Sequence, residues 1–162
     1  MSPDVDALIA RLADAERRLA EHAAKPPPPG LTAPDPAGGE QWETDQVWAH
    51  LAEFPAYWLG QAQRVVALPT YEPVPFGRVK TDAGRIEAIE RDRHTDPPAL
   101  LERVRSSLAE VTEAVRNLPP EAWTRRGAHP SRGDMTVQRI VEQFIVEHLE
   151  EHADQLDSLR RD

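Results

Sequence analysis

The sequence contains no cysteine among its 162 residues. This absence excludes disulfide bridges, iron–sulfur clusters, cysteine nucleophiles and thiolate metal ligands. Any metal site must therefore be built from nitrogen and oxygen ligands, and any sulfur nucleophile must come from a second molecule.

Basic residues and long apolar runs are also in short supply. The chain has 19 Lys and Arg against 28 Asp and Glu, a formal net charge of −9, which argues against a nucleic-acid partner because phosphate binding needs clustered cations. No run approaches the roughly 18 apolar residues of a membrane span. The N-terminus is acidic and amphipathic, unlike a signal peptide. We therefore expect a cytoplasmic protein with no nucleic-acid or membrane partner.

Glycine is scarce, with 8 residues, whereas alanine, leucine, glutamate and arginine are abundant. This composition favours helices over sheet. A chain of this length is long enough for one hydrophobic core. We expect a single helical domain over residues 1–162.

Apolar residues recur at helical spacing in four segments. The predicted helices span residues 4–24, 43–68, 97–117 and 136–160. Long connections separate them: a proline- and glycine-rich segment at 25–41, residues 69–95 with a loop over 71–79 and a short helix over 83–93, and residues 118–134. Pro55 predicts a kink or a local break inside the second helix. Long, one-sided helices bury their apolar stripes against one another, so the predicted fold is an all-α four-helix bundle.

The stretch FIVEHLEEHADQL places two histidines on the apolar face of the last helix. His148 and His152 share one stripe with Phe144 and Leu156, because steps of four residues advance a helix by about 400°. His50 lies on the apolar stripe of the second helix in the same way. Three imidazoles are thus expected to point inward from two helices. The other histidines lie near a helix end or in connections: His22, His94 and His129.

A buried histidine is either a hydrogen-bonded core residue or a ligand. Each unsatisfied ring nitrogen would cost about 1–3 kcal/mol, and one divalent cation would satisfy a nitrogen on each of the three rings. Nitrogen ligands without thiolate suit Zn²⁺, Ni²⁺, Cu²⁺ or Fe²⁺, with Zn²⁺ or Ni²⁺ expected here. Three ligands also leave a position open, as in catalytic sites. We predict a metal site at His50, His148 and His152.

Three glutamates lie near the predicted ligands. Glu53 is one helical turn beyond His50, where it can serve as a hydrogen-bond acceptor of the ligand, a fourth ligand or a base, or remain a solvated surface charge. Glu147 and Glu151 each precede a ligand by one residue, so they are expected to flank the site or face solvent.

Three stretches carry a resemblance to a known family: VWAHLAEFPAYW (47–58), WTRRGAHPSRGDMTVQRIVEQF (123–144) and HLEEHADQL (148–156). Together they resemble the DinB superfamily, also called DinB/YfiT-like, from about Trp42 to the end of the chain. The resemblance implies an up-and-down bundle, commonly a homodimer, with a metal held by His50, His148 and His152.

The resemblance also implies a range of activities. Characterised relatives include S-transferases and isomerases that use mycothiol or bacillithiol, and related hydrolases. We therefore expect a metal-dependent enzyme whose three-histidine site activates a low-molecular-weight thiol cosubstrate. The alternatives are a metal-dependent hydrolase that activates water, and a non-catalytic metal-binding or stress-related bundle that acts through a partner.

Two further sets of residues are candidates for binding. Apolar residues of the second helix that lie off its core stripe are expected to form a dimer surface: Trp48, Tyr57 and Leu59. Residues of the last connection are candidates for holding an anionic thiol conjugate, with ordinary surface charge as the alternative for the arginines: Trp123, Arg125, Arg126 and Arg132.

Overall fold

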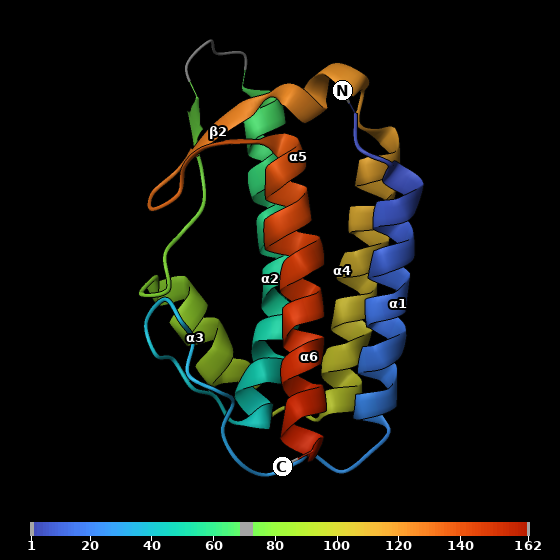
Figure 1. Cartoon of the computed structure of the whole chain (residues 1–162), viewed down its shortest axis with the longest axis vertical. Helices are drawn as coiled ribbons and strands as arrows, with labels where there is room; N and C mark the ends of the chain where they lie inside the picture. Colours follow the sequence, from blue (N-terminus) through green and yellow to red (C-terminus); the bar gives the residue numbers. More distant parts are fainter. Residues whose placement is uncertain (1, 69–72, 162) are drawn as a thin grey trace.

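The structure is a computed structural model of the chain and describes residues 2–68 and 73–161. Four long helices run along its length (Figure 1). The first three are α1 (Val5–Ala23), α2 (Thr44–Ala67) and α4 (Pro97–Asn117). The fourth is continuous from Val137 to Arg161 and consists of α5 (Val137–Ile140), the π-helical segment η2 (Val141–Glu147) and α6 (His148–Arg161). These helices lie where the apolar periodicity predicts them.

The order of the helices in space differs from the predicted up-and-down bundle. Helix α1 packs against α4 and α6, and α2 packs against the same two helices, so that α1 and α2 lie diagonally across the bundle. Helices α2 and α4 run in the same direction, and α1 and α6 run in the opposite one (Figure 1). The prediction of up-and-down topology is therefore wrong. Two long connections cause the difference, because residues 24–43 cross one end of the bundle and residues 73–96 lead back along it.

The prediction of an all-α fold is also wrong, because the connections form a small sheet. Its strands are β1 (Val74–Pro75), β2 (Arg126–His129) and β3 (Gly133–Thr136), in the order β1-β2-β3. Strand β1 is parallel to β2, and β2 is antiparallel to β3. A short 3-10 helix, η1 (Pro120–Thr124), precedes β2. Two- and four-residue strands are too short to show an alternating pattern, which is why residues 71–79 and 118–134 read as loops. Tyr71 and Glu72 of the predicted loop lie outside the described residues.

The short helix expected over 83–93 is present as α3 (Ala83–Asp92). Asp82 is its N-cap residue, and the Asp82 side chain accepts a hydrogen bond from the Arg85 N–H. This capping is typical of helix N-termini. Helix α2 runs through Pro55 without a break. No described helix is both long enough and apolar enough to cross a membrane.

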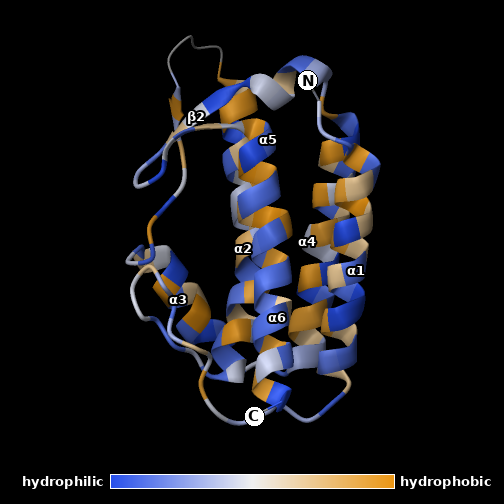
Figure 2. Cartoon of the chain, viewed as in Figure 1, coloured by the Kyte–Doolittle hydropathy of each residue, from blue (hydrophilic) through white to orange (hydrophobic). Residues whose placement is uncertain are grey.

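The hydrophobic core lies between the four long helices, whose surfaces alternate between hydrophobic and hydrophilic residues (Figure 2). Helix α2 is buried on more than one side. Trp48 and Leu59 are only 2% and 7% exposed, and Tyr57 is half-buried under the Arg78 guanidinium. The expectation that these three residues form an exposed apolar surface is therefore wrong, because they pack within the chain itself.

Candidate metal centre

The structure brings the three predicted histidines together inside the bundle. His50 comes from the middle of α2, and His148 and His152 come from the first turns of α6. One ligand atom from each residue lies within 4.8 Å of the others, and the Nε2 atoms of His50 and His148 are 3.2 Å apart. His50 and His152 are buried, whereas His148 is half-buried. The geometry is that of a three-histidine group able to hold one ion.

Each ring has its Nδ1 atom against an oxygen atom, and a different kind of group supplies each oxygen. His50 Nδ1 lies 2.8 Å from a Glu53 carboxylate oxygen, although its N–H is not well aligned with that oxygen. His148 Nδ1 contacts the Phe144 carbonyl at 3.2 Å. His152 Nδ1 lies 2.6 Å from the Gln155 Oε1 atom.

Acceptors on Nδ1 orient an imidazole so that Nε2 is left to bind a metal. The Nε2 atom of His152 is buried and has no hydrogen-bond partner among residues 2–68 and 73–161. A buried nitrogen without a partner is costly in a protein that binds nothing there. The donor set therefore fits a divalent transition metal ion.

The π-helical segment η2 supplies one of these acceptors. In an α-helix the His148 N–H would donate to the Phe144 carbonyl, but here it donates to the Ile145 carbonyl. The Phe144 carbonyl instead contacts the His148 ring. Single π-helical turns occur often at functional sites, and this one ends at a candidate ligand.

Burial keeps the three rings neutral. Removal from water lowers the pKa of His50 and His148 well below the ordinary value, and lowers that of His152 to about 4. Neighbouring histidines lower the pKa of His50 and His148 further, and the Arg85 guanidinium lowers all three. A neutral imidazole is the form that binds metal, so the rings are in the binding form at neutral pH.

Glu53 is not a solvated surface charge, because its side chain is only 9% exposed. Arg78 donates to its carboxylate at 2.7 Å, and the Arg78 guanidinium lies 3.9 Å from the centre of the Tyr57 ring. Burial raises the pKa of the Glu53 carboxyl, and the charge of Arg78 opposes this. The carboxylate is shared between Arg78 and His50, which supports its role as an acceptor behind the ligand. Glu147 is half-buried and Glu151 is exposed.

A tryptophan and an arginine that sequence reasoning missed cover one side of the histidines. The Trp42 ring stacks on His152 with centroids 5.8 Å apart and meets His50 edge-on at 5.0 Å. The Arg85 guanidinium lies 5.1 Å from the Trp42 ring and binds the Glu40 carboxylate. Trp42 and Glu40 belong to the connection before α2, where no periodicity signals burial. A single tryptophan in a polar stretch was the only signal available.

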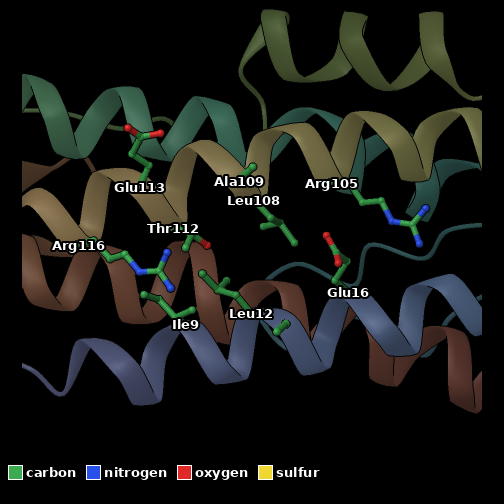
Figure 3. Close-up of a pocket in the computed structure, with 10 residues that line it drawn as sticks. Ile9, Leu12, Glu16, Arg105, Leu108, Ala109, Thr112, Glu113 and Arg116 are labelled. Carbon is green, nitrogen blue, oxygen red and sulfur yellow. The ribbon is translucent and has the colours of Figure 1, made fainter.

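A hollow of about 600 Å³ lies elsewhere, between α1 and α4 (Figure 3). Ile9, Leu12 and Leu108 line its floor, and Glu16 and Arg105 stand at one end. None of the three histidines lines it, so this hollow is separate from the candidate metal centre.

Residues 5–156 match the family model of the DinB superfamily. The chain belongs to the DinB superfamily. A search of curated proteins found no match. Among solved structures, this DinB protein is similar to YfiT from Bacillus subtilis, with a TM-score of 0.75 and 18% identity over 99% of this chain and 89% of that one. YfiT is described as a probable metal-dependent hydrolase with an unusual four-helix bundle topology.

Two other solved structures share the fold. A mycothiol-dependent maleylpyruvate isomerase has a TM-score of 0.70 and 13% identity, over 95% of this chain and 61% of that one. The colibactin self-resistance protein ClbS, solved in complex with double-stranded DNA, has a TM-score of 0.67 and 14% identity, over 100% and 99%. At these identities the likeness establishes the fold alone.

Proposed function

We propose that this DinB superfamily protein binds a divalent transition metal ion, Zn²⁺ or Ni²⁺, through His50, His148 and His152. The observation that carries the proposal is the convergence of three neutral rings, with His152 Nε2 buried and without a partner in the part of the chain that the structure describes. Glu53, Phe144 and Gln155 hold the rings by their Nδ1 atoms. The protein thus provides three oriented ligands and leaves any further coordination position to a molecule from solution.

We further propose that the metal serves a thiol-dependent S-transferase or isomerase reaction. A bound divalent ion would supply Lewis acidity, lowering the pKa of a thiol or of water. The chain has no cysteine, so the thiol must be a low-molecular-weight cosubstrate. The mycothiol dependence of one structural neighbour supports this choice. Metal-dependent hydrolysis is the second candidate, supported by the description of YfiT.

The protein's own residues prepare the centre for either reaction. Trp42 and Arg85 cover the His50 and His152 rings and exclude water from that side. His148 is half-buried, whereas His50 and His152 are buried. Nucleic-acid binding, seen in one structural neighbour, is not proposed for this chain because its net charge is −9.

Metal titration tests the proposal. Calorimetric titration of the metal-free protein with Zn²⁺ and Ni²⁺ should give one site per chain, and Co²⁺ should quench Trp42 fluorescence because the indole contacts two of the ligands. His148→Ala should abolish both signals, whereas His94→Ala, at an exposed histidine outside the site, should preserve them. Unchanged binding by His148→Ala would overturn the proposal.

Self-association as a homodimer is a separate proposal, which rests on the family resemblance. The buried positions of Trp48 and Leu59 leave it without the surface that the sequence suggested. Light scattering over a wide concentration range tests it, and a constant monomer mass would refute it.

A further inference from the structure

The neutral ring of His50 can carry its hydrogen on either nitrogen, and the two forms have opposite consequences for metal binding. With the hydrogen on Nδ1, the ring faces the Glu53 carboxylate, 2.8 Å away, and the Nε2 lone pair is free. With the hydrogen on Nε2, the ring donates to His148 Nε2 at 3.2 Å. The second form uses two ligand atoms for one hydrogen bond, so only the first form can bind an ion.

His148 is the acceptor in that alternative hydrogen bond. Its Nδ1 lies 3.2 Å from the Phe144 carbonyl, which can only accept, so the His148 hydrogen is on Nδ1 and its Nε2 carries a lone pair. Two Nε2 lone pairs 3.2 Å apart repel each other in the metal-free protein. This repulsion favours the Nε2–H form of His50 unless the contact at its Nδ1 outweighs it.

Arg78 fixes the carboxylate that makes this contact. One nitrogen of its guanidinium lies 2.7 Å and 2.5 Å from the two oxygens of Glu53. The side chains of Arg78 and Glu53 are only 7% and 9% exposed, and the guanidinium lies 3.9 Å from the centre of the Tyr57 ring. A charge-assisted pair shielded from water in this way is strong, so the Glu53 carboxylate is held facing His50.

The backbone next to Arg78 is fixed on two sides, by α2 and by β2. The Gly77 N–H donates to Gln61 Oε1 of α2 at 2.8 Å. Gly77 has a φ of +88°, and a side chain at this position would meet the His129 ring of β2 at 2.5 Å. Only glycine allows this conformation and this close approach together. The reach of Arg78 to Glu53 is therefore set by the fold.

The residues predicted from the sequence to hold an anionic conjugate do not take part in this contact. Trp123 is a core residue with 2% exposure. The three arginines of the last connection contact other groups: Arg125 the Leu68 carbonyl, Arg126 the Asp134 carboxylate and Arg132 the Phe144 ring.

We propose that Arg78 is a positioning residue of the metal centre: through Glu53 it holds the His50 hydrogen on Nδ1 and keeps Nε2 free for the ion. This inference rests on the proposed function. Groups that orient a metal-ligating histidine change metal affinity by about 10–100-fold. Loss of Arg78 should therefore close the centre to metal by a change of tautomer, with all three histidines still present.

The experiment measures the His50 tautomer in the metal-free protein by ¹⁵N NMR of the histidine rings, and Zn²⁺ affinity by competition with a chelator. The wild type should carry the His50 hydrogen on Nδ1. Arg78→Met should move it mainly to Nε2 and weaken Zn²⁺ binding about tenfold or more, and Arg78→Lys, which keeps the charge, should restore part of both. The control Arg64→Met removes another arginine contact between α2 and the same connection, from Arg64 Nε to the Pro75 carbonyl at 3.0 Å. It should match the wild type.

Glu53→Gln tests whether Arg78 acts through the carboxylate. This variant alone should also weaken Zn²⁺ binding. Adding Arg78→Met to Glu53→Gln should weaken it further by about twofold or less, because two changes to one chain of contacts are not additive.

Three results would overturn the role of Arg78 while leaving the metal site intact. They are a wild-type His50 with its hydrogen on Nε2, an unchanged His50 tautomer in Arg78→Met, and fully additive losses of affinity in the double variant. Circular dichroism checks the folding of each variant, and if Arg78→Met does not fold, Arg78→Lys and Glu53→Gln carry the same comparison. A wild type that takes up no Zn²⁺ would overturn the metal-site proposal itself, and the inference with it.

Discussion

The orientation of each histidine depends on an atom that does not belong to the candidate ligand set. The Nδ1 atoms of His50, His148 and His152 contact a carboxylate, a backbone carbonyl and a side-chain amide, respectively. Such outer contacts raise ligand basicity and fix ring orientation. Metal affinity should therefore respond to residues that never touch the ion.

Gln155→Leu tests this at the simplest of the three contacts. The substitution removes the oxygen 2.6 Å from His152 Nδ1 and keeps the side-chain volume. We expect the metal dissociation constant to rise about 10–100-fold in calorimetric titration. Gln138→Leu, at a glutamine of the same long helix whose side chain donates a hydrogen bond to Glu142, should leave affinity unchanged. Equal affinities in the two variants would contradict the role of Gln155.

The metal-free protein should lose stability in mild acid. Burial lowers the pKa of His152 to about 4, and lowers those of His50 and His148 well below the ordinary value of about 6.5. Below pH 6.5 these histidines are protonated in the unfolded chain but stay neutral in the folded protein. The free energy of unfolding therefore falls by up to about 1.4 kcal/mol per pH unit for each ring. This stability is fully present above about pH 7. Urea unfolding with chelator at pH 7.5, 6.5 and 5.5 measures it, and a constant free energy would refute it.

The three candidate ligands could be predicted from the sequence because they lie on long helices. His50, His148 and His152 follow the apolar stripes, and helical phase places them inward without any knowledge of tertiary structure. Trp42, Arg78 and Arg85 have no such phase, because two lie in connections and one in a ten-residue helix. Their positions follow from tertiary packing that periodicity does not encode.

At the scale of elements, the junction between α1 and α6 depends on a buried histidine and one arginine. Arg160 donates to His22 Nδ1 at 2.7 Å and to the carbonyls of His22 and Pro26, while His22 Nε2 lies 2.7 Å from Asp157. The His22 carbonyl, in the last turn of α1, also accepts from the Lys25 N–H, and Pro26 follows the helix. The arginine thus joins the end of α1 and the start of the next connection to α6.

Arg160→Met should therefore weaken this junction. Three hydrogen bonds are lost and partly buried acceptors remain, so we expect the free energy of unfolding to fall by about 2 kcal/mol. Arg161→Met is the matched control, since Arg161 is exposed and its side chain donates a hydrogen bond to Ser158 in the same helix. It should stay within about 0.5 kcal/mol of the wild type. Equal urea midpoints for the two variants would show that the junction does not depend on Arg160.

Helix boundaries were predictable to within a few residues, but two kinds of element were not. The π-helical segment η2 differs from an α-helix by its hydrogen bonds and not by an evident change in apolar spacing. The strands are held by pairing between residues 74–75 and 126–136, which are distant in sequence. At Gly127 a side chain would meet Phe76 at 2.5 Å, a close approach that only the folded chain makes visible.

At the scale of the whole molecule, metal binding and folding should be linked. An ion that binds only the folded protein stabilises it by mass action, about 2.7 kcal/mol at a free concentration one hundred times the dissociation constant. For a chain of this size we expect one cooperative transition whose Tm rises by about 5–10 °C with Zn²⁺ or Ni²⁺. His148→Ala should fold but show no rise. A wild-type Tm that is insensitive to both metal and chelator would contradict the linkage.

The diagonal position of α1 has a consequence for how the molecule forms. Within the described residues helix α1 packs mainly against α4 and α6, which begin at residues 97 and 148. The next long helix along the chain, α2, is not one of its main partners. Its contacts therefore close large loops, and their entropic cost must be met before the packing energy is gained. Helices α2, α4 and α6 together carry the histidines and much of the core, so they can associate first. We therefore expect the contacts of helix α1 to form late on the folding pathway.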